Sequence, residues 1–194
     1  MRTVLWHCFG LQSASVYPHD LNDNKELEEY VGHIGPDSRG RLRFPSGLAL
    51  FKTHEPPPDN SPAIYVVRDG RAASVSLWEY YNRNISLEDI IAGKHRAGTW
   101  SKHLLAWKPW KRRSTLLIKY EDLLDNLPVG LEQLKRFLGR EIISMELPDR
   151  NKLSDIDGRW VRKKTDWQTE FNDAAMRLFN KTNRKMMQKM RYYS

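Results

Sequence analysis

The sequence predicts an α/β fold in three layers, with a central parallel sheet covered by helices. Three short runs are apolar at every residue, at positions 47–51, 63–67 and 115–118. Such runs are typical of strands that are buried on both faces. Strands that alternate with helices indicate a layered α/β domain. Helical patterns lie between and after the runs, near residues 70–82, 99–110, 128–138 and 172–190.

The chain before the first apolar run has a different character. Residues 1–9 form an apolar pattern that predicts a short helix, and a charged helix is expected near residues 24–32. Residues 34–47 are rich in Gly, Pro, Lys and Arg and are expected to form a loop. A length of 194 residues suits one domain, so we expect a single domain over residues 1–194.

The composition points to an anionic partner. Lys and Arg number 32 against 24 Asp and Glu, which gives a net charge of +8. Such an excess favours nucleic acid, an acidic membrane or a phosphorylated small molecule. Cys8 stands alone, which excludes an intramolecular disulfide and a site with several cysteine ligands. Neither a secretion signal nor an apolar run of membrane-spanning length is present, so a cytoplasmic protein is expected.

Basic and hydrogen-bonding residues follow each apolar run. The first run is followed by Lys52, Thr53 and His54. The second is followed by residues 68–71 and the third by residues 119–122, which also begin with Arg and Lys. Ligands of open α/β sheets bind at the carboxyl ends of the strands. A basic strand edge beside helix N-termini therefore predicts a phosphate site.

Five segments, in this order, resemble the cytosolic-type sulfotransferases. They are residues 51–56, 64–76, 98–107, 120–123 and 162–167, which match the Lys-Thr-His, phosphate-binding, Trp-rich, Tyr-Glu-Asp and late Arg-Lys motifs of that family. The resemblance covers nearly the whole chain. It implies a fold like that of the P-loop nucleotide kinases, with 3′-phosphoadenosine 5′-phosphosulfate (PAPS) as the donor. It also implies 3′-phosphoadenosine 5′-phosphate (PAP) as the product, a small hydroxyl or amine acceptor, and no metal.

The resemblance assigns two catalytic candidates. His54 would be the general base, because a neutral imidazole has a pKa near working pH. Lys52 lies two residues earlier and would point the same way along a strand. By resemblance it contacts the bridging oxygen and stabilises the leaving phosphate. The alternatives are a loop histidine bonded to a neighbour and a solvated lysine at the strand end.

The remaining candidates would bind the nucleotide. By resemblance, Arg68 and Ser76 bind the 3′-phosphate and Tyr120 lies near the adenine. The alternatives are an ion pair of Arg68 with Asp69 or Asp122, a buried helix serine, and core packing of the tyrosine. A further pair, which is expected to close over the 3′-phosphate, is Arg162 and Lys163.

The sequence departs from the family pattern in two places. The late segment is two residues shorter than usual, and Lys164 replaces the first glycine of that motif. At the other end, the family has a strand and a loop that wraps the phosphosulfate. Met1 is expected to fall just after that loop, so we expect this chain alone not to transfer sulfuryl groups at a useful rate.

Three functions compete at this point. The first is sulfuryl transfer from PAPS to a hydroxyl or amine. The second is a catalytically inactive remnant that retains partial nucleotide binding. The third is a basic nucleic-acid-binding protein, which ranks last because its basic residues are dispersed among acidic ones in the sequence.

Overall fold

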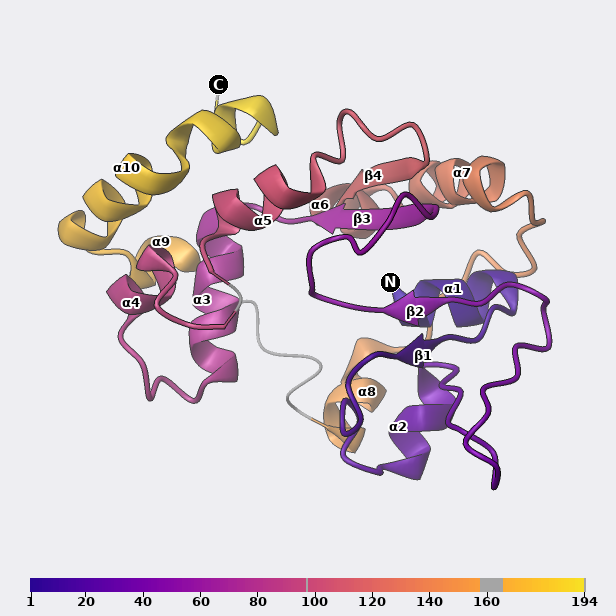
Figure 1. Cartoon of the computed structure of the whole chain (residues 1–194). Coiled ribbons are helices and arrows are strands. Elements are labelled where there is room, and N and C mark those ends of the chain that lie inside the picture. Colours follow the sequence, from indigo (N-terminus) through magenta and orange to yellow (C-terminus); the bar gives the residue numbers. More distant parts are fainter. Residues whose placement is uncertain (97, 158–165, 194) are drawn as a thin grey trace. The chain divides into compact units, whose positions relative to one another are not determined.

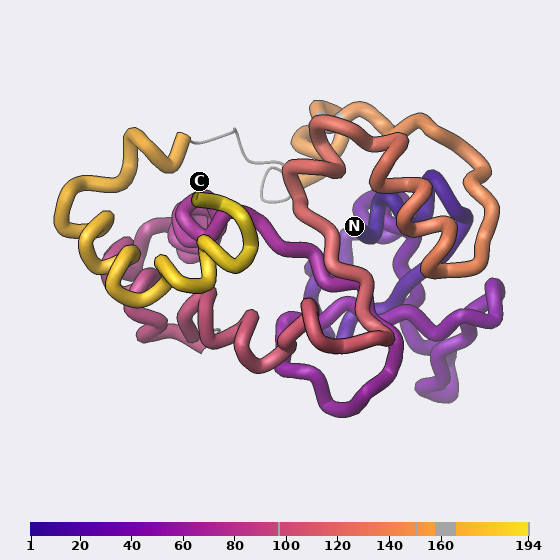
Figure 2. The backbone as a smooth tube through the Cα atoms, turned by 90° about the horizontal axis from the view of Figure 1, so that it is seen from above, coloured from indigo at the N-terminus to yellow at the C-terminus, as the bar shows by residue number. Residues whose placement is uncertain are grey.

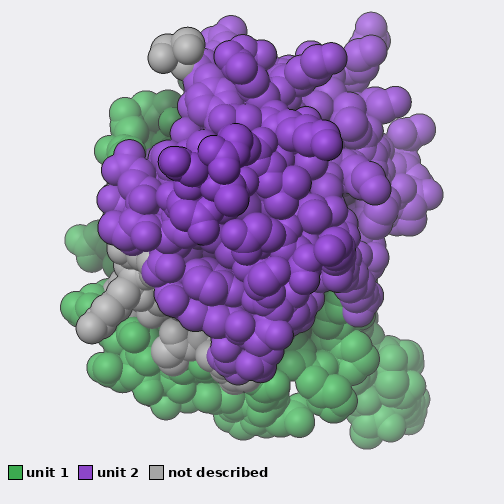
Figure 3. Space-filling view, turned by 90° about the vertical axis from the view of Figure 1, so that its left-hand side faces the viewer, with its two compact units in different colours: residues 1–54, 122–162 green, residues 55–121, 163–194 purple. Residues whose placement is uncertain are grey.

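The computed structural model describes residues 1–96, 98–157 and 166–193. The chain forms two compact units, shown in different colours in Figure 3. Unit 1 consists of residues 1–54 and 122–162, and unit 2 consists of residues 55–121 and 163–194. Each unit is therefore assembled from two separate stretches of the sequence.

Unit 1 combines a small sheet with short helices. Its two strands pair in parallel, with Ala14 opposite Phe51 and Ser15 opposite Lys52. A parallel bridge between Ser13 and His33 extends this arrangement. The elements are α1 (Arg2–Phe9), β1 (Ala14–Ser15), α2 (Lys25–Tyr30), β2 (Phe51–Lys52), α7 (Leu127–Leu138) and α8 (Arg150–Ile156). The helix α6 (Tyr120–Asp125) joins the two units in the sequence.

A cluster of apolar side chains holds α2 against α8. Asn24 begins α2, because its side-chain oxygen accepts a hydrogen bond from the Leu27 N–H group at 3.0 Å. Leu27 is then fully buried, as is Val31. Leu153 of α8 and Leu21 belong to the same cluster. The segment from Leu21 to Val31, which contains α2, is thereby fixed against α8.

The prediction of a doubly buried strand at residues 47–51 is wrong. Only Phe51 and Lys52 form a strand there, and in the described chain it pairs with β1 alone. The side chains alternate between exposed and half-buried along residues 47–51, and Phe51 is 51% exposed. Its ring packs edge to face on Phe44, at 5.3 Å between centroids, and so finds an apolar partner at the surface.

Unit 2 contains the strand pair that the sequence predicts best. The strands β3 (Ala63–Val67) and β4 (Thr115–Lys119) run in parallel, with Ala63 opposite Thr115 and Val67 opposite Lys119. They lie side by side in Figure 1. The helices of this unit are α3 (Gly70–Tyr80), α4 (Leu87–Ala92), α5 (Trp100–Trp107), α9 (Trp167–Glu170) and α10 (Asp173–Lys189).

The long helix α10 closes the core of unit 2. It packs against α3, α4 and α5, and Figure 2 shows its yellow trace beside the segments that form those helices. Phe179 and Met187 of α10 are fully buried together with Val75 and Ile91. Parallel strands with helices packed around them confirm the predicted α/β class. No helix within the described residues is long and apolar enough to cross a membrane.

Two segments of unit 2 concentrate basic residues, although bases and acids alternate in the rest of the unit. Residues 90–119 contain no Asp or Glu, and neither do residues 174–193. These two segments pack together, because α5 contacts α10 and Lys189 lies 4.7 Å above the ring of Trp110. The linear sequence separates the two segments by more than fifty residues, which hides this concentration of positive charge.

Candidate functional site

Arg68 and Tyr120 meet at the carboxyl edge of the β3–β4 pair. Each residue directly follows its strand, and the register places Val67 opposite Lys119. The next residue of each strand must therefore lie close to its counterpart. The guanidinium carbon of Arg68 lies 5.0 Å from the centroid of the Tyr120 ring. This is a cation–π contact at the place where sheets of this class bind ligands.

Glu121 forms hydrogen bonds at the same carboxyl edge of the β3–β4 pair. One of its carboxylate oxygens accepts a hydrogen bond from the Asp69 N–H group at 2.9 Å. The other accepts one from the Tyr192 hydroxyl at 2.7 Å, and that hydroxyl also lies 3.3 Å from the Val67 carbonyl oxygen. The start of α3, the end of β3 and the C-terminal segment are thus joined through one carboxylate.

Arg68 does not adopt the proposed ion pair with Asp69. The carboxylate of Asp69 binds Arg71 instead, with Nε at 3.0 Å and Nη2 at 2.5 Å. Arg71 also lies over the Trp167 ring at 4.1 Å, so this pair forms a structural clamp. No salt bridge joins Arg68 to any carboxylate among the described residues of unit 2. Its guanidinium lies two residues before the start of α3.

Ser76 lies in the second turn of α3 and is half-buried. The neighbouring Ser74 is buried, and its hydroxyl donates to the Gly70 carbonyl oxygen at 2.8 Å. Ser74 is thus committed to the helix itself, whereas Ser76 donates to no described residue of its unit. A phosphate-binding role for Ser76 stays a prediction. Arg162 and Lys163 lie outside the described residues.

In unit 1, Lys52 and His54 are both held by the turn that follows β1. The Lys52 ammonium nitrogen lies 2.6 Å from Asp20 Oδ1 and 4.7 Å from the centroid of the Tyr17 ring. The His54 N–H group donates to the Tyr17 hydroxyl at 2.8 Å. The rings of His54 and Tyr17 stack with centroids 5.8 Å apart and an interplanar angle of 23°.

A buried arginine fixes Asp20 from the other side. Arg2 is 7% exposed, and its Nη1 donates to Asp20 Oδ2 at 3.3 Å. Its Nε donates to the Ser13 hydroxyl and its Nη2 to the Ser13 carbonyl, each at 3.0 Å. Nη2 also lies 2.7 Å from His33 Nδ1. Burial, followed by the charge of Arg2, lowers the pKa of His33 below its ordinary value, so the imidazole is neutral and accepts this bond.

Sequence reasoning missed Asp20, Arg2 and Tyr17. Asp20 lies in a polar stretch of the sequence that carries no periodic pattern, and 32 residues separate it from Lys52. Tyr17 is likewise far from His54 in the sequence. Within each unit the structure brings the predicted residues together, Lys52 with His54 and Arg68 with Tyr120.

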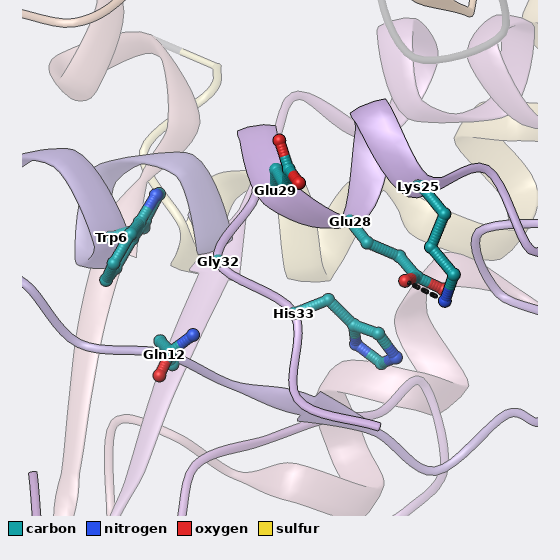
Figure 4. Close-up of a pocket in the computed structure, with 7 residues that line it drawn as sticks. All are labelled: Trp6, Gln12, Lys25, Glu28, Glu29, Gly32 and His33. Atoms are coloured by element: carbon teal, nitrogen blue, oxygen red, sulfur yellow. Dashed lines mark hydrogen bonds and ion pairs between the residues drawn. The ribbon is translucent and has the colours of Figure 1, made fainter. Parts of the chain in front are cut away.

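A cavity of about 250 Å³ lies on unit 1. Its walls come from α1, from α2 and from the loops around them, and Figure 4 shows the Lys25–Glu28 ion pair beside the His33 ring. The predicted site residues do not line this cavity. The lining residues are Trp6, Gln12, Lys25, Glu28, Glu29, Gly32 and His33.

The comparison with protein families decides what the fold and its edge residues represent. The model of the sulfotransferase domain matches residues 36–165, which include β2, β3, β4 and the residues that follow them. The chain belongs to the sulfotransferase family. The match confirms the resemblance to cytosolic-type sulfotransferases that the five motifs predict.

Individual relatives of this sulfotransferase are distant. Human sulfotransferase 2B1 is 26% identical over 162 residues, which cover 66% of this chain and 44% of that protein. Rat sulfotransferase 1A1 is 28% identical over 92 residues, which cover 41% of this chain and 31% of that protein. The chain thus spans less than half the length of these curated relatives.

Two solved structures share the fold of this sulfotransferase. Retinol dehydratase, in complex with androsterone and the inactive cofactor PAP, has a TM-score of 0.55 at 21% identity. The alignment covers 74% of this chain and 54% of that one. Mouse sulfotransferase SULT7A1, complexed with PAP, has a TM-score of 0.51 at 20% identity, with 66% and 58% coverage. The likeness confirms the predicted fold class.

Proposed function

We propose that this sulfotransferase moves a sulfuryl group from PAPS to a hydroxyl or amine of a small molecule. The acceptor oxygen or nitrogen attacks sulfur while the bond between sulfur and the bridging phosphate oxygen breaks in line. His54 takes the proton of the acceptor, and Lys52 offsets the negative charge that develops on the leaving phosphate. The products are the sulfated acceptor and PAP.

The Arg68–Tyr120 contact carries this proposal. A cation–π contact forms no N–H···O hydrogen bond, so the N–H groups of Arg68 can still donate to a phosphate. The positive end of α3, a helix of 11 residues, adds to the attraction for an anion. These features fit a nucleotide phosphate, and the neighbours of known structure are complexed with PAP. In our proposal Arg68 and Ser76 bind the 3′-phosphate, with Arg162 and Lys163, and Tyr120 lies near the adenine.

The proposed function also includes a class of acceptor and a cellular location. The androsterone complex of retinol dehydratase supports a small-molecule acceptor. We propose that the basic segments 90–119 and 174–193 of unit 2 attract the anionic donor and not nucleic acid, and that the protein acts in the cytoplasm as a single sulfotransferase domain. No group of three or more His, Cys, Asp or Glu within the described residues is arranged to hold a metal ion.

Substitution of Arg68 tests the nucleotide site. Arg68→Ala should weaken PAP binding by about 1.5–3 kcal/mol, the range for hydrogen bonds to charged groups. Adenosine 5′-phosphate, which lacks the 3′-phosphate, should lose much less affinity. Isothermal titration calorimetry with both nucleotides measures this difference. Arg113→Ala is the matched control, because it removes one exposed positive charge from the same unit.

Two outcomes would count against the proposal. Equal losses for both nucleotides in Arg68→Ala would mean that Arg68 supports the fold and does not bind the 3′-phosphate. A protein that binds PAP but transfers no label from radioactive PAPS to phenols, alcohols or amines would instead be the inactive remnant. That transfer assay uses the purified protein.

A further inference from the structure

We propose that Asp20 is a positioning residue, which holds the Lys52 ammonium group in the orientation that sulfuryl transfer requires. This inference rests on the proposed function, because Lys52 is the group that would meet the leaving phosphate. The observation behind it is the short contact of 2.6 Å between Lys52 Nζ and Asp20 Oδ1. Only about a quarter of the Lys52 side chain is exposed, and Asp20 is more deeply buried still.

The carboxylate of Asp20 is itself fixed. Its second oxygen accepts a hydrogen bond from Arg2, and the other N–H groups of that guanidinium bind Ser13 and His33. Ser13 and His33 are joined by a backbone bridge next to β1. Asp20 is therefore anchored to the sheet of unit 1 and cannot rotate without breaking a buried hydrogen-bond network.

The network around Asp20 holds more positive than negative charge. One carboxylate lies between two cations, Arg2 and Lys52, so the group retains a net positive charge. A lysine whose charge was offset by a carboxylate that bound no other cation would attract a phosphate less strongly. Asp20 instead shares its negative charge between Arg2 and Lys52. The Lys52 ammonium group is therefore held in place, and part of its positive field still acts on a phosphate. Preorganised charge of this kind is the usual source of electrostatic catalysis.

The same turn also orders His54. The Asp20 N–H group donates to the Tyr17 carbonyl oxygen at 3.3 Å, which closes the turn over residues 17–20. Tyr17 accepts a hydrogen bond from the His54 backbone and stacks on its ring. One turn thus holds both predicted catalytic side chains, and a structural ion pair alone would not require this arrangement.

Steady-state kinetics on the purified protein provides the first test. Asp20→Asn keeps the size of the side chain but removes its charge, and we expect kcat to fall about tenfold to a hundredfold, as for a misplaced catalytic group. The KM for PAPS should change less than about threefold, since an intact nucleotide site preserves ground-state binding. Asp20→Glu should recover part of kcat, and Asp20→Asn should add no loss to Lys52→Ala.

Asp23→Asn is the matched control. Asp23 lies in the same loop, is 86% exposed, and pairs with His19 at 3.8 Å, so its replacement should leave kcat unchanged. Urea unfolding of each variant shows whether the fold survives. Equal kcat for wild type and a folded Asp20→Asn would overturn the proposal. So would a further loss of kcat when Asp20→Asn is added to Lys52→Ala.

A second readout does not depend on activity. Proton–nitrogen NMR spectra selective for lysine ammonium groups detect an ammonium whose hydrogen exchange is slowed by an ion pair. The Lys52 signal should be present in the wild type and in Asp23→Asn, and it should broaden or disappear in Asp20→Asn. An unchanged Lys52 signal in Asp20→Asn would refute the positioning role even if the protein transferred no sulfuryl group.

Discussion

The imidazole of His33 shows how burial decides the protonation state of a single residue in unit 1. Its Nδ1 lies 2.7 Å from a guanidinium nitrogen of Arg2, which can only donate. A protonated imidazole would place two donors face to face in a partly buried setting. Burial and the charge of Arg2 accordingly lower the pKa of His33 below its ordinary value of 6.5.

This pKa shift predicts a loss of stability in mild acid. Above pH 6.5 His33 is neutral in both the folded and the unfolded chain, so it contributes no pH dependence. Below pH 6.5 the unfolded chain takes up a proton first, and the free energy of unfolding falls by up to about 1.4 kcal/mol per pH unit until the folded pKa is reached. His33→Asn retains an acceptor for Arg2 but cannot titrate. Urea titrations at several pH values should show a steeper acid decline for wild type than for His33→Asn, and parallel curves would contradict the assignment.

At the scale of elements, a single amide joins two helices of unit 2. Asn183 of α10 is 1% exposed, and its side-chain oxygen accepts hydrogen bonds from the backbone N–H and the hydroxyl of Ser101 at 3.1 and 2.7 Å. Ser101 lies in the first turn of α5, where backbone N–H groups have no partner within the helix. Asn183 therefore serves as an acceptor for the start of a helix from another part of the chain.

Asn183→Ala should destabilise the protein by about 1–3 kcal/mol, because the Ser101 donors would remain buried without an acceptor. Chemical denaturation followed by circular dichroism measures this loss. Gln188→Ala changes an exposed amide on the same helix and is expected to stay within about 0.5 kcal/mol of wild type. Similar losses for the two variants would mean that the Ser101 contact does not account for the effect, since alanine itself favours the helix.

The elements that the sequence predicts well are those with a long pattern. The runs at 63–67 and 115–118 become β3 and β4, and the pattern near 172–190 becomes α10. The short strand β1 has only two residues, which is too few for any periodicity, and the run at 47–51 shows that apolar residues alone do not ensure burial. The helix α4 had usable signals, since Ser86 caps its start and Gly93 ends it in the left-handed conformation.

The candidate site also has contacts that the sequence predicts and contacts that it does not. Arg68 and Tyr120 are predictable neighbours, because parallel strands of matched register deliver the next residues to one edge. The partners of Lys52 and His54 are not predictable in this way. Pro18 signals the turn over residues 17–20 locally, but the side chains that Tyr17 and Asp20 meet there depend on the tertiary fold.

For the whole molecule, the distribution of charge matters more than its total. The exposed residues Lys181, Arg184 and Lys185 of α10 form no salt bridge with a described residue. Other bases of unit 2 have acidic partners, as in the pairs Lys94–Asp89 and Arg96–Glu55. An uncompensated surface of one sign raises the association rate of an oppositely charged ligand, and salt suppresses that effect.

We therefore expect the association rate of PAP to fall severalfold when Lys181, Arg184 and Lys185 are all changed to Gln, with little change in the dissociation rate. The difference from wild type should shrink as ionic strength rises. Stopped-flow fluorescence measures both rates. The control changes the ion-paired Arg83, Lys94 and Arg96 to Gln, which alters the net charge equally. Equal effects of the two triple variants would show that only net charge matters.

The discontinuous make-up of the two units has a consequence for biosynthesis. A ribosome releases residues 55–121 long before α10, yet Phe179 and Met187 of α10 complete the core around Val75 and Ile91. The core around Val75 and Ile91 therefore stays incomplete until α10 has been synthesised. We therefore expect unit 2 to complete its core only after α10 has left the ribosome, and a nascent chain without α10 would expose apolar side chains of α3 and α4 that favour aggregation.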